Sequence, residues 1–375
     1  MSLTIPPGVS LSEIPALQPP PGVTPNFTNP ESQAHGVMIA NGIITAVMLV
    51  FVLLRVYTKA FLTKTLFWED AACIAGTVMS VGYLGLLAHV FQPGRLGPHQ
   101  WNVRLTVLLN DSYIKELKAV NFLYGPMMTF TKLSILLLYF RLFSPTKTIR
   151  IWIYVGIVTT LLNHVVGTII AITICLPSDA VGYSRCSGRL HPLDVVINAI
   201  NILSDFYILV LPLFVISKLH MQRAKKFGVS AVFLTGFLAC VSSIAGLAYR
   251  IKTWKSEDIS WWIGPMLLCS LTEINIGLIV GCMPVLPVLF QHEKGLKFVG
   301  KYFSSLRSDI HSLRNILRTK RSSDDEKESH LRAPPPELGL HHPLKDSGSS
   351  FASTPKEDGK LAHDETSCYE PVTMV

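Results

Sequence analysis

The sequence predicts an all-α membrane protein, a bundle of seven transmembrane helices. Hydrophobic residues make up 49% of the 375 residues and charged residues only 15%, against about 25% in soluble domains. The apolar residues gather in seven stretches, each close to the roughly 20 residues that a helix needs to cross a bilayer. One of these stretches contains a full charge, Lys132, and charges at such depth usually face a bundle interior and a partner.

The stretch 116–143 that holds Lys132 is the element around which we place the others. It ends in Tyr139-Phe140-Arg141-Leu142-Phe143, an aromatic and cationic collar suited to a membrane–water boundary. The seven expected spans are 35–57, 68–90, 116–143, 151–175, 193–217, 227–249 and 261–290. We expect loops at 92–115, at 251–260 and at 176–192, where the last is rich in glycine and proline.

The regions outside the spans are predicted from composition. Residues 1–34 are rich in proline, serine and threonine and are expected to form a disordered tail, and the polar residues 322–375 a second one. Residues 291–321 alternate apolar and basic positions at helical spacing. This pattern predicts a basic amphipathic helix that either lies on the anionic inner leaflet or packs against the end of the bundle.

The basic residues also suggest an orientation. The short loops carry ten Lys and Arg on one side and nine on the other, which decides nothing, but none precedes Arg55 and eight lie between Lys294 and Arg321. Basic flanks mark the cytoplasm, so we expect the N-terminus outside and the C-terminus in the cytoplasm. The plasma membrane is the expected location, with the ER and vacuolar membranes as alternatives. The net charge of +8 then fits a lipid surface, and no nucleic-acid partner is expected.

Polar residues inside the spans predict an intramembrane network. Asp194, Asn198, Asn201 and Asp205 follow the spacing i, i+4, i+7, i+11, which lines one helix face. Lipid cannot satisfy such a face, so it should look inward. The last span adds Glu273 and Asn275. At about 1.5 Å per residue, Lys132 lies roughly 22 Å below the outer end of its span, and Asp205 and Glu273 about 18 Å below theirs.

The three charges could therefore meet in one layer, with Lys132 held by either acid. One interpretation is a switch coupled to a ligand, and the equally weighted alternative is a static salt bridge that holds the bundle together. Asn163 and His164 are candidates to join the network. Near the inner surface, Glu69 and Asp70 share a layer with basic side chains of the neighbouring spans and are expected to form interfacial ion pairs with Arg55, Lys59 and Arg141.

Two further features concern the outer side. Cys175 directly precedes the loop 176–192 and Cys186 lies within it, and on the oxidising side of the membrane a disulfide is preferred over two free thiols. Asn26 and Asn110 each begin a glycosylation sequon. No nucleophile, phosphate-loop, dinucleotide or metal motif occurs, so neither a catalytic site nor a metal is predicted.

The motifs of the chain resemble those of the fungal rhodopsin-domain membrane proteins. This group includes the satratoxin-cluster membrane protein family and the GPCR-like pathogenicity receptors of fungi. The residues that carry the resemblance are Arg55-Val56-Tyr57, Trp68-Glu69-Asp70, Leu123-Tyr124, Lys132-Leu133-Ser134, Tyr139 to Phe143, Cys175-Leu176-Pro177, Cys186, Asp205, Leu211-Pro212, Glu273-Ile274-Asn275 and Cys282-Met283-Pro284.

The resemblance implies a receptor-like protein that senses a small-molecule or surface ligand and signals to a cytoplasmic partner. The alternative is an enzyme, transporter or accessory factor of a secondary-metabolite pathway. No retinal is expected, because the last span contains no lysine before Lys294 for a Schiff base. The N-terminal tail has no cysteines, so the extracellular CFEM module of some relatives is absent from it.

The orientation predicts that Asn26 carries a glycan. Asn26→Gln should remove a glycosidase-sensitive mobility shift, while Asn110, close to the membrane, is the weaker acceptor. The measurement is a gel of membrane fractions with and without glycosidase. A tag fused after Val375 that antibodies reach on intact cells would overturn the orientation.

Overall fold

The computed structural model describes residues 13–142, 147–175, 180–216 and 223–291. Within them seven helical segments are long and apolar enough to cross a membrane, and no β-strand occurs among these residues. The predicted all-α, seven-span fold is confirmed. The expected helix at 291–321, apart from its first residue, and the tail 322–375 lie outside the described residues.

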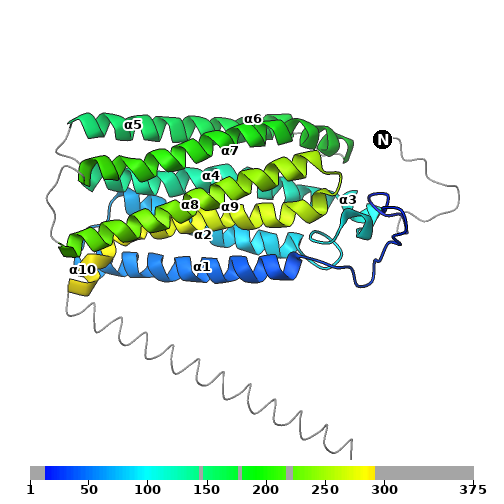
Figure 1. Ribbon diagram of the computed structural model, residues 1–375, viewed down its shortest axis with the longest axis horizontal. Helices are drawn as coiled ribbons and strands as arrows, with labels where there is room; N and C mark the ends of the chain where they lie inside the picture. Colours follow the sequence, from blue (N-terminus) through cyan, green and yellow to red (C-terminus); the bar gives the residue numbers. More distant parts are fainter. Residues whose placement is uncertain (1–12, 143–146, 176–179, 217–222, 292–375) are drawn as a thin grey trace, which may run out of the picture. The chain divides into compact units, whose positions relative to one another are not determined.

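The helices are drawn in Figure 1. They are α1 (Ala34–Tyr57) continued by the π-helical turn η1 (Thr58–Leu62), α2 (Trp68–Val90), the short η2 (Gln100–Asn102) and α3 (Leu105–Leu108), α4 (Asp111–Leu142), α5 (Lys147–Leu161), η3 (Leu162–Val166) and α6 (Gly167–Ile174), which together form the fourth span, α7 (Ala180–Ile216), α8 (Arg223–Lys255), α9 (Ile259–Cys282), η4 (Met283–Val285) and α10 (Leu286–Gln291).

Two predicted loops are corrected by the structure. The expected loop 176–192 is helical from Ala180 onward, so that Gly182, Gly188 and Pro192 all lie inside α7. The expected loop 251–260 shrinks to the residues between Lys255 and Ile259. Glycine and proline are weak signals here because helices of a membrane bundle tolerate both, since neighbouring helices and side chains satisfy the backbone groups that they leave free. The hydropathy pattern ends at the hydrocarbon boundary, but the helix continues beyond it.

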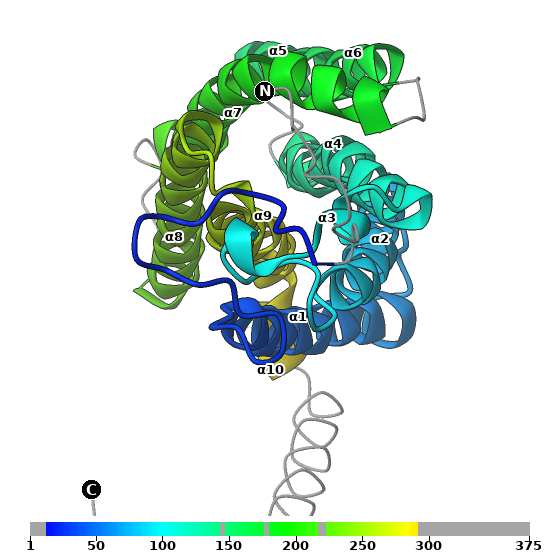
Figure 2. The same cartoon turned by 90° about the vertical axis from the view of Figure 1, so that its right-hand side faces the viewer.

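The span α9 occupies the interior of the helix arrangement. It packs against α1, α2, α4 and α8, and α4 in turn packs against α2, α5 and α7. In Figure 2 α9 lies between α8 on one side and α2 and α4 on the other. The spans α4 and α9 are the most buried, whereas the others keep broad apolar faces exposed, with residues such as Ile43, Val78 and Leu203. These faces are the surface that contacts lipid.

Small residues let the helices approach closely at two places. A Cβ built on Gly125 of α4 would lie 2.0 Å from Thr168 Oγ1 of α6, and one on Gly277 of α9 would lie 2.6 Å from Thr131 Cγ2 of α4. Close approach at small residues is the usual way in which helices pack in a bilayer. These contacts set the distance between α4 and its neighbours, and so the place of Lys132.

The N-terminal segment differs from the expected disordered tail. Residues 13–33 lie against the connection between α2 and α4, where Ala16 N donates to Val103 O over 2.9 Å, Leu105 N to Ile14 O over 2.9 Å and Gln33 N to Gly97 O over 3.2 Å. Proline restricts the unfolded chain, so ordering this segment costs little entropy. The backbone of residues 13–33 also accepts a hydrogen bond from the α2–α4 connection, at Ile14 O from Leu105 N. Composition alone could not reveal this partner, and residues 1–12 lie outside the described part.

Candidate functional site

A cavity of about 110 Å³ lies between α2, α4, α7, α8 and α9, near the end of the spans that carries residues 13–33. We call it the N-terminal pocket. Its apolar lining comes from residues such as Leu117, Ile263 and Met266. Its polar lining consists of Tyr83, Lys118, Asn121, Tyr124, His191, Asp194, Arg250, Thr253 and Ser270. A mostly enclosed space with a few convergent polar groups is the usual form of a small-molecule site.

Arg250 of α8 lies in this pocket, and its side chain is only 8% exposed. Its Nη2 donates to Ser270 Oγ over 3.0 Å, and its guanidinium carbon lies 4.9 Å from the centre of the Tyr124 ring. The carboxylate of Asp194 is 3.9 Å from Nη1, an ion pair without a short hydrogen bond. The predicted network residue Asp194 therefore belongs to the pocket.

Arg250 was missed by sequence reasoning, which assigned it to the edge of a loop. A signal was nevertheless present. Arg250 follows Ser243 by seven residues, so both side chains point from the same face of a helix. Ser243 Oγ donates to Asp205 Oδ2 over 2.6 Å, which shows that this face looks inward.

The polar interior begins one helix turn below the pocket. Tyr124 Oη donates to Asn198 Oδ1 over 3.2 Å, and Asn198 Nδ2 donates to Asp194 O over 2.8 Å. Asn198 therefore lies between the pocket and the middle of α7. The predicted polar face of α7 makes contacts along its length. Asp194 lines the pocket, and Asn201 and Asp205 contact Glu273 and Lys132 deeper in the bundle.

Lys132 lies with its ammonium against α7. Its Nζ is 2.9 Å from Asp205 Oδ1, and it donates to Ser204 Oγ over 2.9 Å and to Asn201 O over 3.1 Å. The side chain is 4% exposed. Three acceptors match the three donors of an ammonium group. Of the two acids that matched Lys132 in depth, the structure places Asp205 against it.

Glu273 has a different partner. Its Oε1 accepts a hydrogen bond of 2.5 Å from Asn201 Nδ2, and no ion pair to Glu273 occurs among the described residues. Asn275, two residues further along α9, accepts from Ser80 Oγ over 2.6 Å and donates to Thr45 Oγ1 over 2.9 Å. The two residues thus connect α9 to opposite sides of the bundle.

The fourth span reaches the same region. Asn163 Nδ2 donates to Ile197 O over 3.2 Å, and the buried ring of His164 lies near Asn201 and Lys132. Both residues sit on the π-helical turn η3, where the extra residue turns their side chains toward α7. We name the whole set the polar layer. Its members are Thr45, Ser80, Lys132, Asn163, Asn201, Asp205, Ser243, Glu273 and Asn275.

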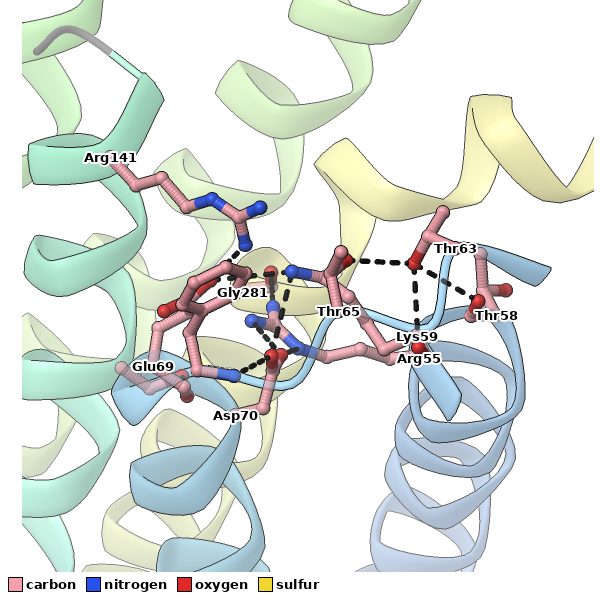
Figure 3. A network of polar contacts seen from close by, with 11 residues as sticks. Arg55, Thr58, Lys59, Thr63, Thr65, Glu69, Asp70, Arg141 and Gly281 are labelled. Carbon is pink, nitrogen blue, oxygen red and sulfur yellow. Dashed lines mark hydrogen bonds and ion pairs between the residues drawn. The ribbon is translucent and has the colours of Figure 1, made fainter. Parts of the chain in front are cut away.

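A second charged group, the ionic cluster, lies at the opposite end of the spans and is drawn in Figure 3. Arg55 Nη2 is 2.7 Å from Asp70 Oδ1, and its Nη1 donates to the carbonyl of Gly281. Lys59 lies 3.3 Å from Glu69 and 3.5 Å from Asp70. Arg141 reaches from α4 to Glu69 over 2.9 Å.

These are the ion pairs expected near the inner surface, and they range from the buried pair of Arg55 and Asp70 to that of Arg141, whose side chain is 40% exposed. The exposed fraction of the Arg55 side chain is 1%, and that of Asp70 is 3%. Phe67 covers the cluster from outside, with its ring centre 3.7 Å from the Arg141 guanidinium. The cluster joins the first, second, third and last spans at one level.

The cysteines and the sequons lie at the N-terminal end. Cys175 and Cys186 form a disulfide with Cα atoms 5.0 Å apart, and both residues line the pocket. Asn26 is exposed at a turn, where its Oδ1 accepts from Thr28 N and Asn29 N. Asn110 is also exposed, and its Oδ1 accepts from Ser112 N over 2.9 Å at the start of α4. Glycosylation of both remains a prediction.

The seven spans, their exposed apolar faces and the buried polar layer define a multi-pass membrane protein with a polar interior. A family model described as the fungal rhodopsin domain matches residues 54–292. The chain belongs to this family, and the predicted resemblance is confirmed.

Two relatives are similar to the chain over much of its length. A protein of Gibberella zeae named Fugralins biosynthesis cluster protein 2 is 31% identical over 307 residues, which are 77% of this chain and 74% of the relative. A SAT4 family membrane protein of Emericella nidulans is 29% identical over 234 residues, which are 61% of this chain and 56% of the relative. No solved structure matches the chain.

The polar layer predicts coupling between Lys132 and Asp205. Lys132→Met leaves Asp205 buried without its cation, and breaking a buried pair typically costs about 3–5 kcal/mol. Lys132→Met should therefore lower the melting temperature, and Asp205→Asn in the same chain should recover part of the loss. Glu273→Gln should recover less, because Glu273 has no contact with the ammonium. The measurement is a thermal melt of the purified wild type and of the three variants.

Lys115→Met is the matched control, since Lys115 lies on the same helix but is exposed. Equal recovery by Asp205→Asn and Glu273→Gln would contradict the pairing. An unchanged melting temperature of Lys132→Met would contradict the whole layer.

The ionic cluster predicts a second loss of stability. Asp70→Asn removes the carboxylate from Arg55, which is nearly inaccessible to water, and the expected cost is again about 3–5 kcal/mol. Lys64→Gln, an exposed change in the connection between η1 and α2, should be neutral. The yield of monodisperse protein after heating measures both. Equal yields of Asp70→Asn and wild type would show that Arg55 finds another partner.

Proposed function

We propose that the chain is a receptor-like membrane protein that binds a small molecule in the N-terminal pocket and passes the event through the polar layer to the opposite face. One observation carries this proposal. The pocket is connected to the polar layer through Asn198, because Tyr124 lies against Arg250 and donates to Asn198, which lies one turn of α7 from Asn201 of the polar layer. A ligand that displaces either side chain would alter the interior at once.

The path from the pocket crosses a helix boundary at almost every contact. It runs from Arg250 on α8 to Tyr124 on α4 and Asn198 on α7. One turn further along α7, Asn201 donates to Glu273 on α9, and its carbonyl accepts from Lys132 on α4. Polar contacts between packed helices change in discrete steps, so a small shift at one site can select between two arrangements.

Two helices continue the path to the other end. The span α4 carries both Lys132 of the polar layer and Arg141 of the ionic cluster. The interior span α9 carries Glu273, and the carbonyl of Gly281 on the same helix accepts from Arg55. A movement of α4 or α9 that begins in the polar layer would therefore reach the ionic cluster. This continuity supports a role in transmission rather than in holding the fold alone.

The proposed orientation places the pocket outside and the ionic cluster at the cytoplasmic surface of the plasma membrane, next to a cytoplasmic signalling partner. It is supported by the basic residues that follow the last span and by both sequons at the pocket end. The proposed receptor uses no retinal, because α9 contains no lysine that could form a Schiff base.

A second candidate is a component of a secondary-metabolite pathway, in which the pocket handles a hydrophobic intermediate. The observation that favours it is the relative of Gibberella zeae, whose name assigns it to a biosynthesis cluster and which is 31% identical to the chain. Both candidate functions use the pocket. They can be distinguished by whether a variant with a filled pocket first loses a transcriptional response or a metabolite.

The test is a deletion strain complemented with wild type or with Ile263→Trp, in which a larger side chain fills the pocket. Ile244→Trp is the matched control, because Ile244 is 49% exposed on the outside of α8. For a receptor, Ile263→Trp should reproduce the transcript changes of the deletion while the protein level stays normal. For a pathway component, one metabolite should disappear and its precursor accumulate before transcripts change. Full rescue of transcripts and metabolites by Ile263→Trp would overturn both.

A further inference from the structure

We infer that the ligand of the N-terminal pocket is a small organic monocarboxylate, with its carboxylate on Arg250 and its apolar body against α4 and α9. The inference rests on the proposed function of the pocket and specifies what it binds. It comes from Arg250, a buried cation of the pocket whose Nε has no hydrogen-bond partner among the described residues.

Arg250 has donors to spare. A guanidinium carries five N–H groups. Nη2 donates to Ser270 Oγ over 3.0 Å, and the buried Nε has no hydrogen-bond partner among the described residues. The distance of 3.9 Å from Nη1 to Asp194 Oδ2 exceeds hydrogen-bond length. Buried donors without acceptors cost free energy, so this site favours a ligand that brings acceptors.

The geometry of a guanidinium selects the kind of acceptor. Its planar fork matches the two oxygens of a carboxylate, which can accept two parallel hydrogen bonds. The Tyr124 ring centre lies 4.9 Å from the guanidinium carbon, and both residues line the pocket. A ligand with only apolar groups would leave the donors unmatched, and a cationic ligand would be repelled by Arg250.

The charges around Arg250 limit the charge of the ligand. Asp194 lies 3.9 Å from Arg250 and already contributes one negative charge, so a ligand with two negative charges is repelled more strongly than a ligand with one. The pocket lining also contains Lys118, so it holds two positive charges, on Lys118 and Arg250, and one negative charge, on Asp194. The sum of the three charges is one positive. A singly charged anion fits this balance better than a phosphate dianion.

The size and the remaining lining describe the rest of the ligand. The pocket has a volume of about 110 Å³, and one bound water occupies roughly 10–15 Å³ of such a volume. The space therefore holds a ligand of roughly ten non-hydrogen atoms. Leu117, Val120, Ile263 and Met266 supply an apolar wall, and the hydroxyl groups of Tyr83 and Thr253 supply further polar atoms. An aromatic or short aliphatic acid meets these conditions.

The experiment compares acids with their neutral amides on the purified full-length protein in lipid nanodiscs. The probes are benzoate with benzamide and hexanoate with hexanamide, which match in shape and differ in charge. Binding is measured by saturation-transfer NMR at millimolar ligand. At least one acid should bind about tenfold or more tightly than its amide, since hydrogen bonds to a charged group contribute that much.

Variants test whether Arg250 is the group that reads the carboxylate. Arg250→Gln should abolish the preference for the acid, and Arg250→Lys should keep part of it, because the charge stays and the fork is lost. Lys252→Gln is the matched control, two residues further along α8, where its ammonium lies over the Trp262 ring and outside the pocket lining. If Arg250→Gln does not fold, the comparison of acid and amide on the wild type still decides.

The outcomes separate this inference from the proposed function. Equal affinity for acid and amide, binding of neither acid, or an acid preference that persists in Arg250→Gln would each overturn the carboxylate. If Ile263→Trp nevertheless reproduces the deletion strain, the pocket keeps its proposed role and takes another ligand. If the acid binds but Ile263→Trp fully rescues the deletion strain, the carboxylate site is retained and the proposed function of the pocket is overturned.

Discussion

The structure depends on one constraint: a polar side chain inside a bilayer finds no water, so the protein must supply its partner. Lys132 shows the consequence most clearly, since an ammonium at that depth is costly unless it is surrounded. Its three acceptors all come from α7. The same requirement recurs at Asn201, Glu273 and Asn275, and each time it is met by a different helix.

The polar layer therefore connects all seven spans. Its members come from each of them in turn, from Thr45 on α1 and Ser80 on α2 to Asn163 on η3 and Ser243 on α8. Apolar packing contributes little preference between helices in lipid, because lipid tails are as apolar as the side chains. Directional polar contacts and close approaches at small residues such as Gly125 therefore determine which helices are neighbours.

A layer of this kind can stabilise the bundle and still respond to a ligand. The N-terminal pocket on one side and the ionic cluster on the other are held by the same helices, α4 and α9. Arg250 in the pocket lies 3.9 Å from its nearest carboxylate partner, Asp194, whereas Arg55 in the ionic cluster lies 2.7 Å from Asp70. The two ends thus differ chemically: one has capacity for a further acceptor, and the other is closed by its own acids.

The sequence by itself determined the membrane class, the seven spans and the inward polar face of α7, because hydropathy and helical spacing are local properties. It also required an acidic partner for Lys132. The choice of Asp205 over Glu273 was decided only by the tertiary structure, since both acids matched in depth and helix rotation selects between them. The same holds for Arg250 in the pocket and for residues 13–33 on the α2–α4 connection. Those contacts join segments far apart in the chain, and no local pattern encodes which surfaces will meet.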